Sequence, residues 1–166
     1  MDTETLQWST ASNLPFPLAY ASATICQNNI YLLGYGTIYN CNPRSVLTCS
    51  MADLLQSCLT PQVVWQVVAE LPVRASSCTT LCGQLLAVGG CDNRFNYCTT
   101  AIHRYNPATD SWEIIGHMPT ARCNTLVAVL PENKLMVVGG NICQIGINSV
   151  TDIVEIATDL KNSEQV

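Results

Sequence analysis

The sequence predicts an all-β fold of small antiparallel sheets, each formed by one copy of a repeated unit. Two apolar segments, GQLLAVGG and NKLMVVGG, end in the same glycine pair, and their last residues Gly90 and Gly140 are 50 residues apart. Trp65 and Trp112 are 47 residues apart. A period near fifty that carries a glycine corner and an aromatic residue is typical of an array in which each period is one small sheet.

An earlier segment repeats the same order in a divergent form. Trp8 precedes NNIYLLGYG, in which Gly34 stands where the first glycine of the pair is expected and Tyr35 replaces the second. The distance from Trp8 to Trp65 is 57 residues, which is longer than the later period. We therefore expect an insertion in this unit, within Tyr35–Leu47.

Alternating apolar residues and β-branched residues predict four strands per unit. The predicted strands are Ala21–Cys26, Asn29–Leu33, Leu47–Leu54 and Val64–Val68 in the first unit, Ala75–Leu81, Gln84–Val88, Thr100–Tyr105 and Ser111–Ile115 in the second, and Asn124–Leu130, Lys134–Val138 and Val150–Ile156 in the third. We expect no helix longer than two turns between residues 75 and 156.

The best-preserved unit resembles the kelch repeat. It contains RASSCTTL, QLLAVGG and AIHRYNPATDSW in that order, so Tyr105 and Trp112 fall where the kelch pattern has a tyrosine and a tryptophan. The rival WD-type repeat has a shorter period of about 40–45 residues. The resemblance implies kelch-type β-propeller blades of four antiparallel strands, about three in number. It also implies that Tyr105 and the repeated tryptophans pack between blades.

We expect a single kelch-repeat domain over residues 1–166 with three blades. The first blade (11–69) carries the insertion, the second spans 70–117, and the third (118–157) lacks its outer strand, which residues 5–10 would complete in a closed ring. Propellers use about four to eight blades. The chain is therefore either part of a longer protein or one half of a six-bladed ring formed by two copies.

Composition narrows the function classes. Charged residues make up 11% of the chain, well below the roughly 25% of an average domain, and the formal net charge is −5. Seven basic residues against twelve acidic ones argue against nucleic-acid binding. No apolar run reaches the about 18 residues that a membrane span needs. The polar start MDTETLQWST is unlike a secretory signal, which favours the cytoplasm.

The ten cysteines are expected to be reduced and mostly buried. Cys26, Cys78, Cys82 and Cys123 lie in or beside apolar strand patterns, where a free cysteine packs as a small hydrophobic residue. Without a signal peptide, reduced thiols fit the cytosol better than a disulfide scaffold. No pair of cysteines or histidines has zinc-ligand spacing. We expect neither a metal nor a cofactor.

Arginines gather on one predicted face, made by the loops before first strands and after second strands. A guanidinium group offers paired hydrogen bonds to a carboxylate, so this face would bind an acidic group. Asparagines near the glycine corners would add amide hydrogen bonds. The candidate partner-binding residues are Arg74, Arg122, Arg94, Arg44, Asn93 and Asn141.

The likeness to BTB-kelch ubiquitin-ligase adaptors implies that these loops form a substrate pocket. In that family an arginine just before a first strand often contributes to the pocket, and Arg74 and Arg122 match this position, which Ala19 or Tyr20 occupies in the first unit. The alternative is that these arginines solvate a loop or bind carbonyl groups of a neighbouring blade.

The sequence favours a non-catalytic protein–protein interaction module, with adaptor-like function, that binds a protein or an acidic peptide. The alternative is an enzyme built on a kelch-type propeller, oxidase-like or lyase-like. The only histidines, His103 and His117, have no evident serine, cysteine or aspartate partner, and nothing matches the copper site of galactose-oxidase-like enzymes. We expect no catalytic residues.

Overall fold

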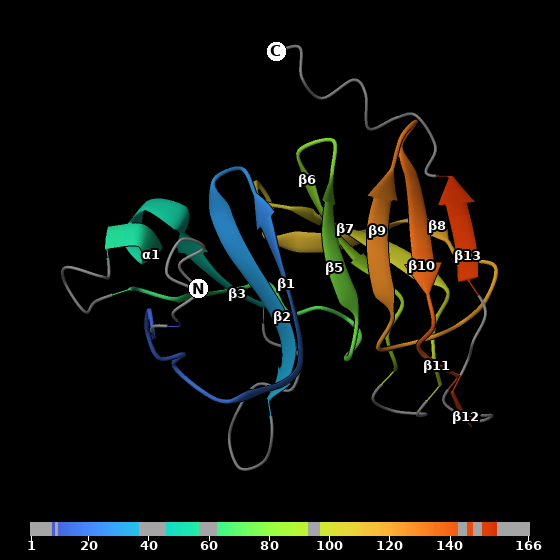
Figure 1. Cartoon of the computed structure of the whole chain (residues 1–166), viewed down its shortest axis with the longest axis horizontal. Coiled ribbons are helices and arrows are strands. Elements are labelled where there is room, and N and C mark those ends of the chain that lie inside the picture. Colours follow the sequence, from blue (N-terminus) through green and yellow to red (C-terminus); the bar gives the residue numbers. More distant parts are fainter. Residues whose placement is uncertain are drawn as a thin grey trace.

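In the computed structural model the described residues are 8, 10–36, 46–56, 63–92, 97–142, 146–147 and 151–155. They form three main antiparallel sheets that follow one another along the chain (Figure 1). The first contains β1 (Leu18–Cys26), β2 (Asn29–Gly36), β3 (Val46–Ser50) and β4 (Gln66–Val68). The second contains β5 (Ser77–Leu81), β6 (Gln84–Val88), β7 (Ala101–Asn106) and β8 (Ser111–His117). The third contains β9 (Leu126–Leu130), β10 (Lys134–Val138) and β13 (Thr151–Glu155), and β11 (Asn141–Ile142) pairs with β12 (Gly146–Ile147).

The predicted fold class is confirmed. Two sheets have four strands in chain order, and the third has three strands among the described residues, as a kelch-type array of blades requires. β6 and β10 have the predicted bounds. Of residues 5–10, only Trp8 and Thr10 are described, and neither lies in a strand.

The repeat is visible in the backbone of the first hairpin of each sheet. The two residues before the second strand have positive φ in all three sheets, at Gln27 and Asn28, at Cys82 and Gly83, and at Glu132 and Asn133. In the first two sheets these residues form a two-residue tight turn whose twist matches the flanking strands, whereas the third turn has one more residue, Pro131. Asparagine and glycine tolerate positive φ best, which explains their place as the last residue of each turn.

The predicted third strand of the first unit is wrong beyond Ser50. The chain turns there into the short helix α1 (Met51–Gln56). The Ser50 hydroxyl oxygen accepts a hydrogen bond from the Ala52 N–H at 3.1 Å, and Asp53 lies in the first turn. A serine cap followed by an early carboxylate stabilises the N-terminus of a helix, so this local signal overrides the strand pattern.

The core lies in two layers, one on each side of the second sheet. Successive residues of β6 point to opposite faces of that sheet. Leu85 and Ala87 pack toward the first sheet, whereas Leu86 and Val88 pack toward the third. Their exposed fractions are 2% or less, so the middle sheet is buried on both faces.

Tyr105 and Trp112 pack as the kelch resemblance implies. Their ring centroids are 5.2 Å apart. The Trp112 indole N–H donates to the Ala69 carbonyl at 3.1 Å, while the Tyr105 hydroxyl donates to Asp110 Oδ1 at 2.7 Å. Trp8 differs from the expectation, because its side chain is 81% exposed and no strand holds it against a blade.

Candidate binding face

The face named for its predicted arginines, the arginine face, is formed where loops of the second and third sheets meet at the lower end of the molecule in Figure 1. One residue with positive φ lies near the start of each first strand: Tyr20 at the irregularity inside β1, and Ala75 and Asn124 two residues before β5 and β9. By this repeat, the equivalent residues just before them are Ala19, Arg74 and Cys123. Arg122 therefore lies one position farther from its strand than Arg74 does.

Backbone pairing confirms the same equivalence. Arg74 and Cys91 exchange both backbone hydrogen bonds, at 3.0 and 2.8 Å, and Cys123 and Asn141 do the same at the same two distances. The Asn124 N–H also donates to the Ala75 carbonyl at 3.0 Å, across the two sheets. The loops of both sheets are thus joined into one hydrogen-bonded corner.

The repeated glycines are required by the close approach of these loops. A Cβ on Gly90 would lie 2.8 Å from the Arg74 carbonyl oxygen and 2.6 Å from the Ser76 hydroxyl. A Cβ on Gly140 would lie 2.6 Å from the Cys123 carbonyl oxygen. Both glycines also have positive φ, which a side chain disfavours. The sequence signal that revealed the repeat is therefore the same feature that builds the face.

The two predicted anchor arginines have different environments. Arg74 is half-buried, so part of its side chain reaches solvent. Arg122 is fully buried, at 0% exposure, and its Nη1 donates to the Gly139 carbonyl at 2.9 Å. The expectation that both arginines occupy one equivalent slot does not match the structure, because Arg122 lies one residue farther from its first strand than Arg74 does. Arg122 instead donates to a carbonyl group of its own sheet unit, at the glycine pair that follows β10.

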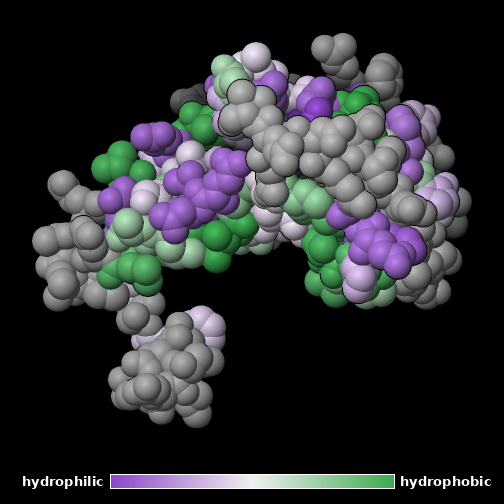
Figure 2. All heavy atoms as spheres, turned by 90° about the horizontal axis from the view of Figure 1, so that it is seen from above, coloured by the Kyte–Doolittle hydropathy of each residue, from purple (hydrophilic) through white to green (hydrophobic). Residues whose placement is uncertain are grey.

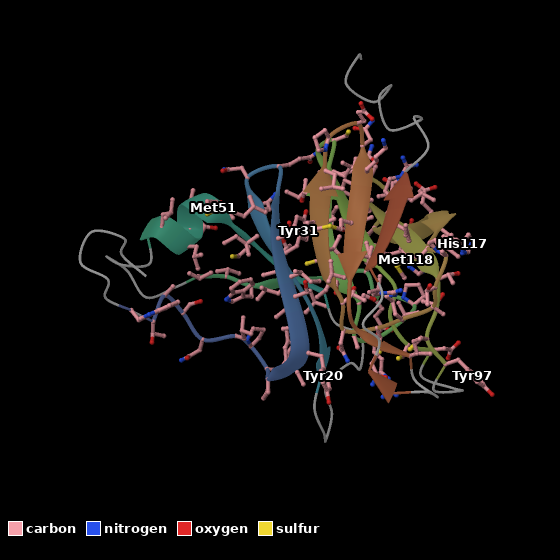
Figure 3. All side chains as sticks on the ribbon, turned by 45° about the vertical axis from the view of Figure 1, so that its right-hand side comes forward. Tyr20, Tyr31, Met51, Tyr97, His117 and Met118 are labelled. Atoms are coloured by element: carbon pink, nitrogen blue, oxygen red, sulfur yellow. The ribbon has the colours of Figure 1, made fainter. Side chains whose placement is uncertain are left out.

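Among the other predicted residues, the Asn141 side chain is exposed beside the corner. Arg44, Asn93 and Arg94 lie outside the described residues. Sequence reasoning missed Tyr97, which is 54% exposed, and Tyr20, at 68%, was noted only as filling a slot. Both lie toward the same lower end in Figure 3. Neither tyrosine belongs to the repeated pattern, so periodicity could not reveal them.

Three cysteines also meet at this corner: Cys91, Cys98 and Cys123, which we call the cysteine corner. Their sulfur atoms lie within 4.8 Å of one another, and those of Cys91 and Cys98 are 3.6 Å apart. Burial raises the pKa of Cys123 to about 12; the hydrogen bond and charge of Cys91 act in the same direction, and the charge of Arg74 acts against it. The spacing of these cysteines matches no zinc motif, so the sequence did not group them.

The described cysteines are mostly free thiols. Six are free, and five of these are buried. Cys26 and Cys78 belong to the apolar layer between the first two sheets, as expected for packing residues. Cys98 is the exception among the described cysteines, since it is disulfide-bonded.

The two histidines lie in β7 and β8. His103 is 4% exposed, and burial, with a smaller contribution from His117, lowers its pKa. His117 is exposed, and its Nδ1 lies 3.0 Å from the Thr100 hydroxyl.

A depression lies toward the opposite end, beside the first hairpin turns of the first two sheets. It is a cavity of about 350 Å³, lined among others by Gly83, Gln84, Arg104 and Glu113. The Arg104 guanidinium pairs with the Glu113 carboxylate at 2.6 Å and donates to Gln84 at 3.2 Å. An arginine at this end therefore already has a carboxylate partner within the chain.

Residues 72–119 match the family model of the Kelch motif. The matched segment spans the second sheet, β5 to β8. The solved structure titled "Structure of YjhT" is similar to the chain with a TM-score of 0.71 and 16% identity, over 95% of this chain and 49% of that one. The likeness supports the fold alone, and this chain spans about half the length of that structure.

The kelch repeat holds only part of the corner. Arg74, Cys91 and Cys98 lie inside the matched segment, whereas Arg122, Cys123 and Asn141 follow it in the next sheet. The candidate face is therefore composite, with side chains from the kelch repeat and from its neighbour. In the described part of the chain, no helix has the length and apolar character to cross a membrane.

Proposed function

We propose that this chain is a non-catalytic protein-interaction module whose arginine face binds an acidic segment of a partner protein. The observation that carries the proposal is the corner itself. Half-buried Arg74 and exposed Asn141 stand on backbone segments that hydrogen bonds hold in register across two sheets. Binding residues are characteristically carried by loops that a rigid scaffold positions.

The chemistry of the face favours an acidic ligand. Arg74 can offer two parallel N–H donors to a carboxylate or phosphate, and Asn141 adds an amide. Tyr20 and Tyr97 supply exposed aromatic surface, and tyrosine and arginine are enriched at protein interfaces.

The resemblance to kelch adaptors supports an adaptor role in the cytoplasm as part of the same proposal. The Arg74–Cys91 backbone pair lies in the segment that matches the Kelch motif. A non-catalytic role agrees with the placement of the histidines, one buried with a lowered pKa and one exposed at a strand end.

Selection from a peptide library tests the proposal directly. The purified chain should retain peptides rich in aspartate, glutamate or phosphoserine over neutral and basic ones. Arg74→Ala should reduce the free energy of binding of the selected peptides by about 1.5–3 kcal/mol, the scale of a charged hydrogen bond. Binding should also weaken as salt rises.

Arg104→Ala is the matched control, because it removes an arginine from the opposite end of the same sheet. It should leave peptide affinity unchanged. Selection of neutral or basic peptides, or equal losses in the two variants, would show that the arginine face is not the binding surface.

A further inference from the structure

The cysteine corner brings a disulfide sulfur next to two thiols. Cys98 is disulfide-bonded, whereas Cys91 and Cys123 are thiols. The other described cysteines are thiols as well, so the bonded partner of Cys98 lies outside the described residues. The sulfur atom of Cys91 is 3.6 Å from that of Cys98, and all three sulfur atoms of the corner lie within 4.8 Å of one another. A thiol therefore touches a disulfide to which it does not belong.

The backbone places Cys91 directly opposite Cys98, in an antiparallel bridge. Two backbone hydrogen bonds flank the pair, from the Asp92 N–H to the Tyr97 carbonyl at 2.9 Å and from the Thr99 N–H to the Gly90 carbonyl at 2.8 Å. The pair itself is thus of the non-hydrogen-bonded type, in which the Cα atoms are about 4.5 Å apart. Disulfides join Cα atoms about 4.4–6.8 Å apart, so rotation of the two side chains is enough to bond Cys91 to Cys98.

Cys91 is better placed than Cys123 to attack the disulfide of Cys98. Only a thiolate attacks a disulfide sulfur. Burial raises the pKa of Cys123 to about 12, and the hydrogen bond and charge of Cys91 act in the same direction, so Cys123 stays protonated near neutral pH. Two backbone hydrogen bonds also tie Cys123 to Asn141 in the third sheet. Cys91 is therefore the nucleophile that the corner offers.

We propose that Cys91 and Cys98 form a thiol–disulfide exchange site, in which the Cys91 thiolate attacks the sulfur atom of Cys98. The bond between Cys91 and Cys98 forms as the existing bond of Cys98 breaks, and the former partner leaves as a thiolate. Cys91 gives its proton to solvent, and the leaving thiolate takes one up. One disulfide replaces another, so the number of thiols is unchanged and the step needs no outside oxidant or reductant.

The exchange changes which segments are crosslinked at the arginine face. The new disulfide closes the loop between Cys91 and Cys98 within the second sheet. Cys91 shares two backbone hydrogen bonds with Arg74, and the sulfur atom of Cys98 lies 3.1 Å from the Asn141 carbonyl oxygen. The site is thus next to both residues of the proposed binding surface. It goes beyond partner binding and does not depend on it.

Disulfide mapping of the unreduced chain tests the site. The protein is purified without reductant, incubated at pH 8 without oxygen and with a metal chelator, quenched with acid, and blocked with N-ethylmaleimide. Trypsin then separates the two cysteines, because Arg94 lies between them. We expect the linked peptides of Cys91 and Cys98 in about one chain in ten or more, as for two disulfides whose stabilities differ by no more than about tenfold. The linked pair should form faster at higher pH, while the total number of thiols stays constant.

Cys123→Ser is the matched control, because it removes the other thiol of the corner and leaves the attacking pair intact. It should still form the linked peptides, whereas Cys91→Ser should not. The wild-type map decides the question even if a variant fails to fold. The proposal is overturned if Cys98 keeps its original partner throughout while Cys91 is labelled by N-ethylmaleimide, or if Cys98 becomes linked to Cys123 instead.

Discussion

At the scale of single residues, Arg74 and Arg122 should have separable roles. The Arg122 guanidinium is fully buried and donates to the Gly139 carbonyl, so Arg122→Ala should lower the free energy of unfolding by about 1.5–3 kcal/mol. Arg74 is half-buried, and Arg74→Ala should change stability by less than about 1 kcal/mol. Urea unfolding of both variants measures this difference. Equal losses would contradict the division between a structural and a surface arginine.

The glycine corner gives a second prediction with a built-in control. Gly90 has φ of 118°, and an added Cβ would lie 2.6 Å from the Ser76 hydroxyl. Gly83 has φ of 69°, with nothing within 4 Å of an added Cβ. Gly83→Ala should lower the free energy of unfolding by about 1–2 kcal/mol, because alanine disfavours the left-handed backbone conformation and nothing else opposes it. Gly90→Ala should cost clearly more, because a collision adds to the strain. Thermal unfolding of the two variants measures this difference, and equal losses of stability would refute the packing explanation.

The Tyr105–Asp110 contact predicts a pH dependence. The hydrogen bond from Tyr105, then that from the Ala69 N–H, lowers the pKa of Asp110. The folded pKa is below the unfolded value of about 3.9, so this stabilisation is present above pH 4 and is lost as pH falls through the folded pKa. Tyr105→Phe should reduce the dependence of the free energy of unfolding on pH between pH 5 and 2, measured by urea unfolding. An unchanged slope would rule the contact out as its source.

Residue positions show where sequence reasoning reached its limit. Arg74 follows Pro72 by two residues, but Arg122 follows Pro119 by three. Matching the two arginines by residue type therefore placed them one position out of register. A shift of one residue in an extended chain turns a side chain to the other face, and Arg122 is accordingly buried.

At the scale of elements, the strands with two supporting signals have their predicted bounds, whereas the third strand of the first unit, predicted from one signal, ends early. β6 and β10 are continuous apolar runs that end in Gly-Gly, and their predicted bounds match. The strand predicted over residues 47–54 rested on apolar residues alone. Ser50 changes the outcome, since its side chain satisfies an N–H of α1 that no backbone carbonyl in the helix can reach.

The cap of α1 can be tested by itself. Ser50→Ala removes the acceptor for the Ala52 N–H and should cost about 1 kcal/mol, whereas Ser50→Asp should keep the cap. Hydrogen exchange of the α1 amides is the measurement. We expect faster exchange in Ser50→Ala and near-normal protection in Ser50→Asp. Equal exchange in all three proteins would mean that β3 packing, rather than the cap, holds the helix.

At the scale of the whole molecule, the stack of sheets is curved and open on one side. Figure 2 shows hydrophobic residues bordering the hollow between its two ends. The third sheet buries one face, with Leu135 and Val137, against the second sheet. Leu126 pairs with Val138 on its other face, and Leu126 is 67% exposed. Among the described residues no element covers this apolar face, and the sheets of repeat proteins normally stack on a neighbour.

We propose that a second copy of this chain covers the exposed face of the third sheet. Three sheets are fewer than a propeller ring contains, and this chain spans 49% of a solved structure of similar fold, so two copies equal the length of one such chain.

Light scattering at micromolar concentration should give twice the chain mass of 18.0 kDa. Leu126→Glu should yield monomers, because it places a charge in the contact. Ile114→Glu, on β8 of the middle sheet and 57% exposed, should leave the dimer intact. A wild-type monomer, or a dimer that tolerates Leu126→Glu, would assign this face to something other than a second copy.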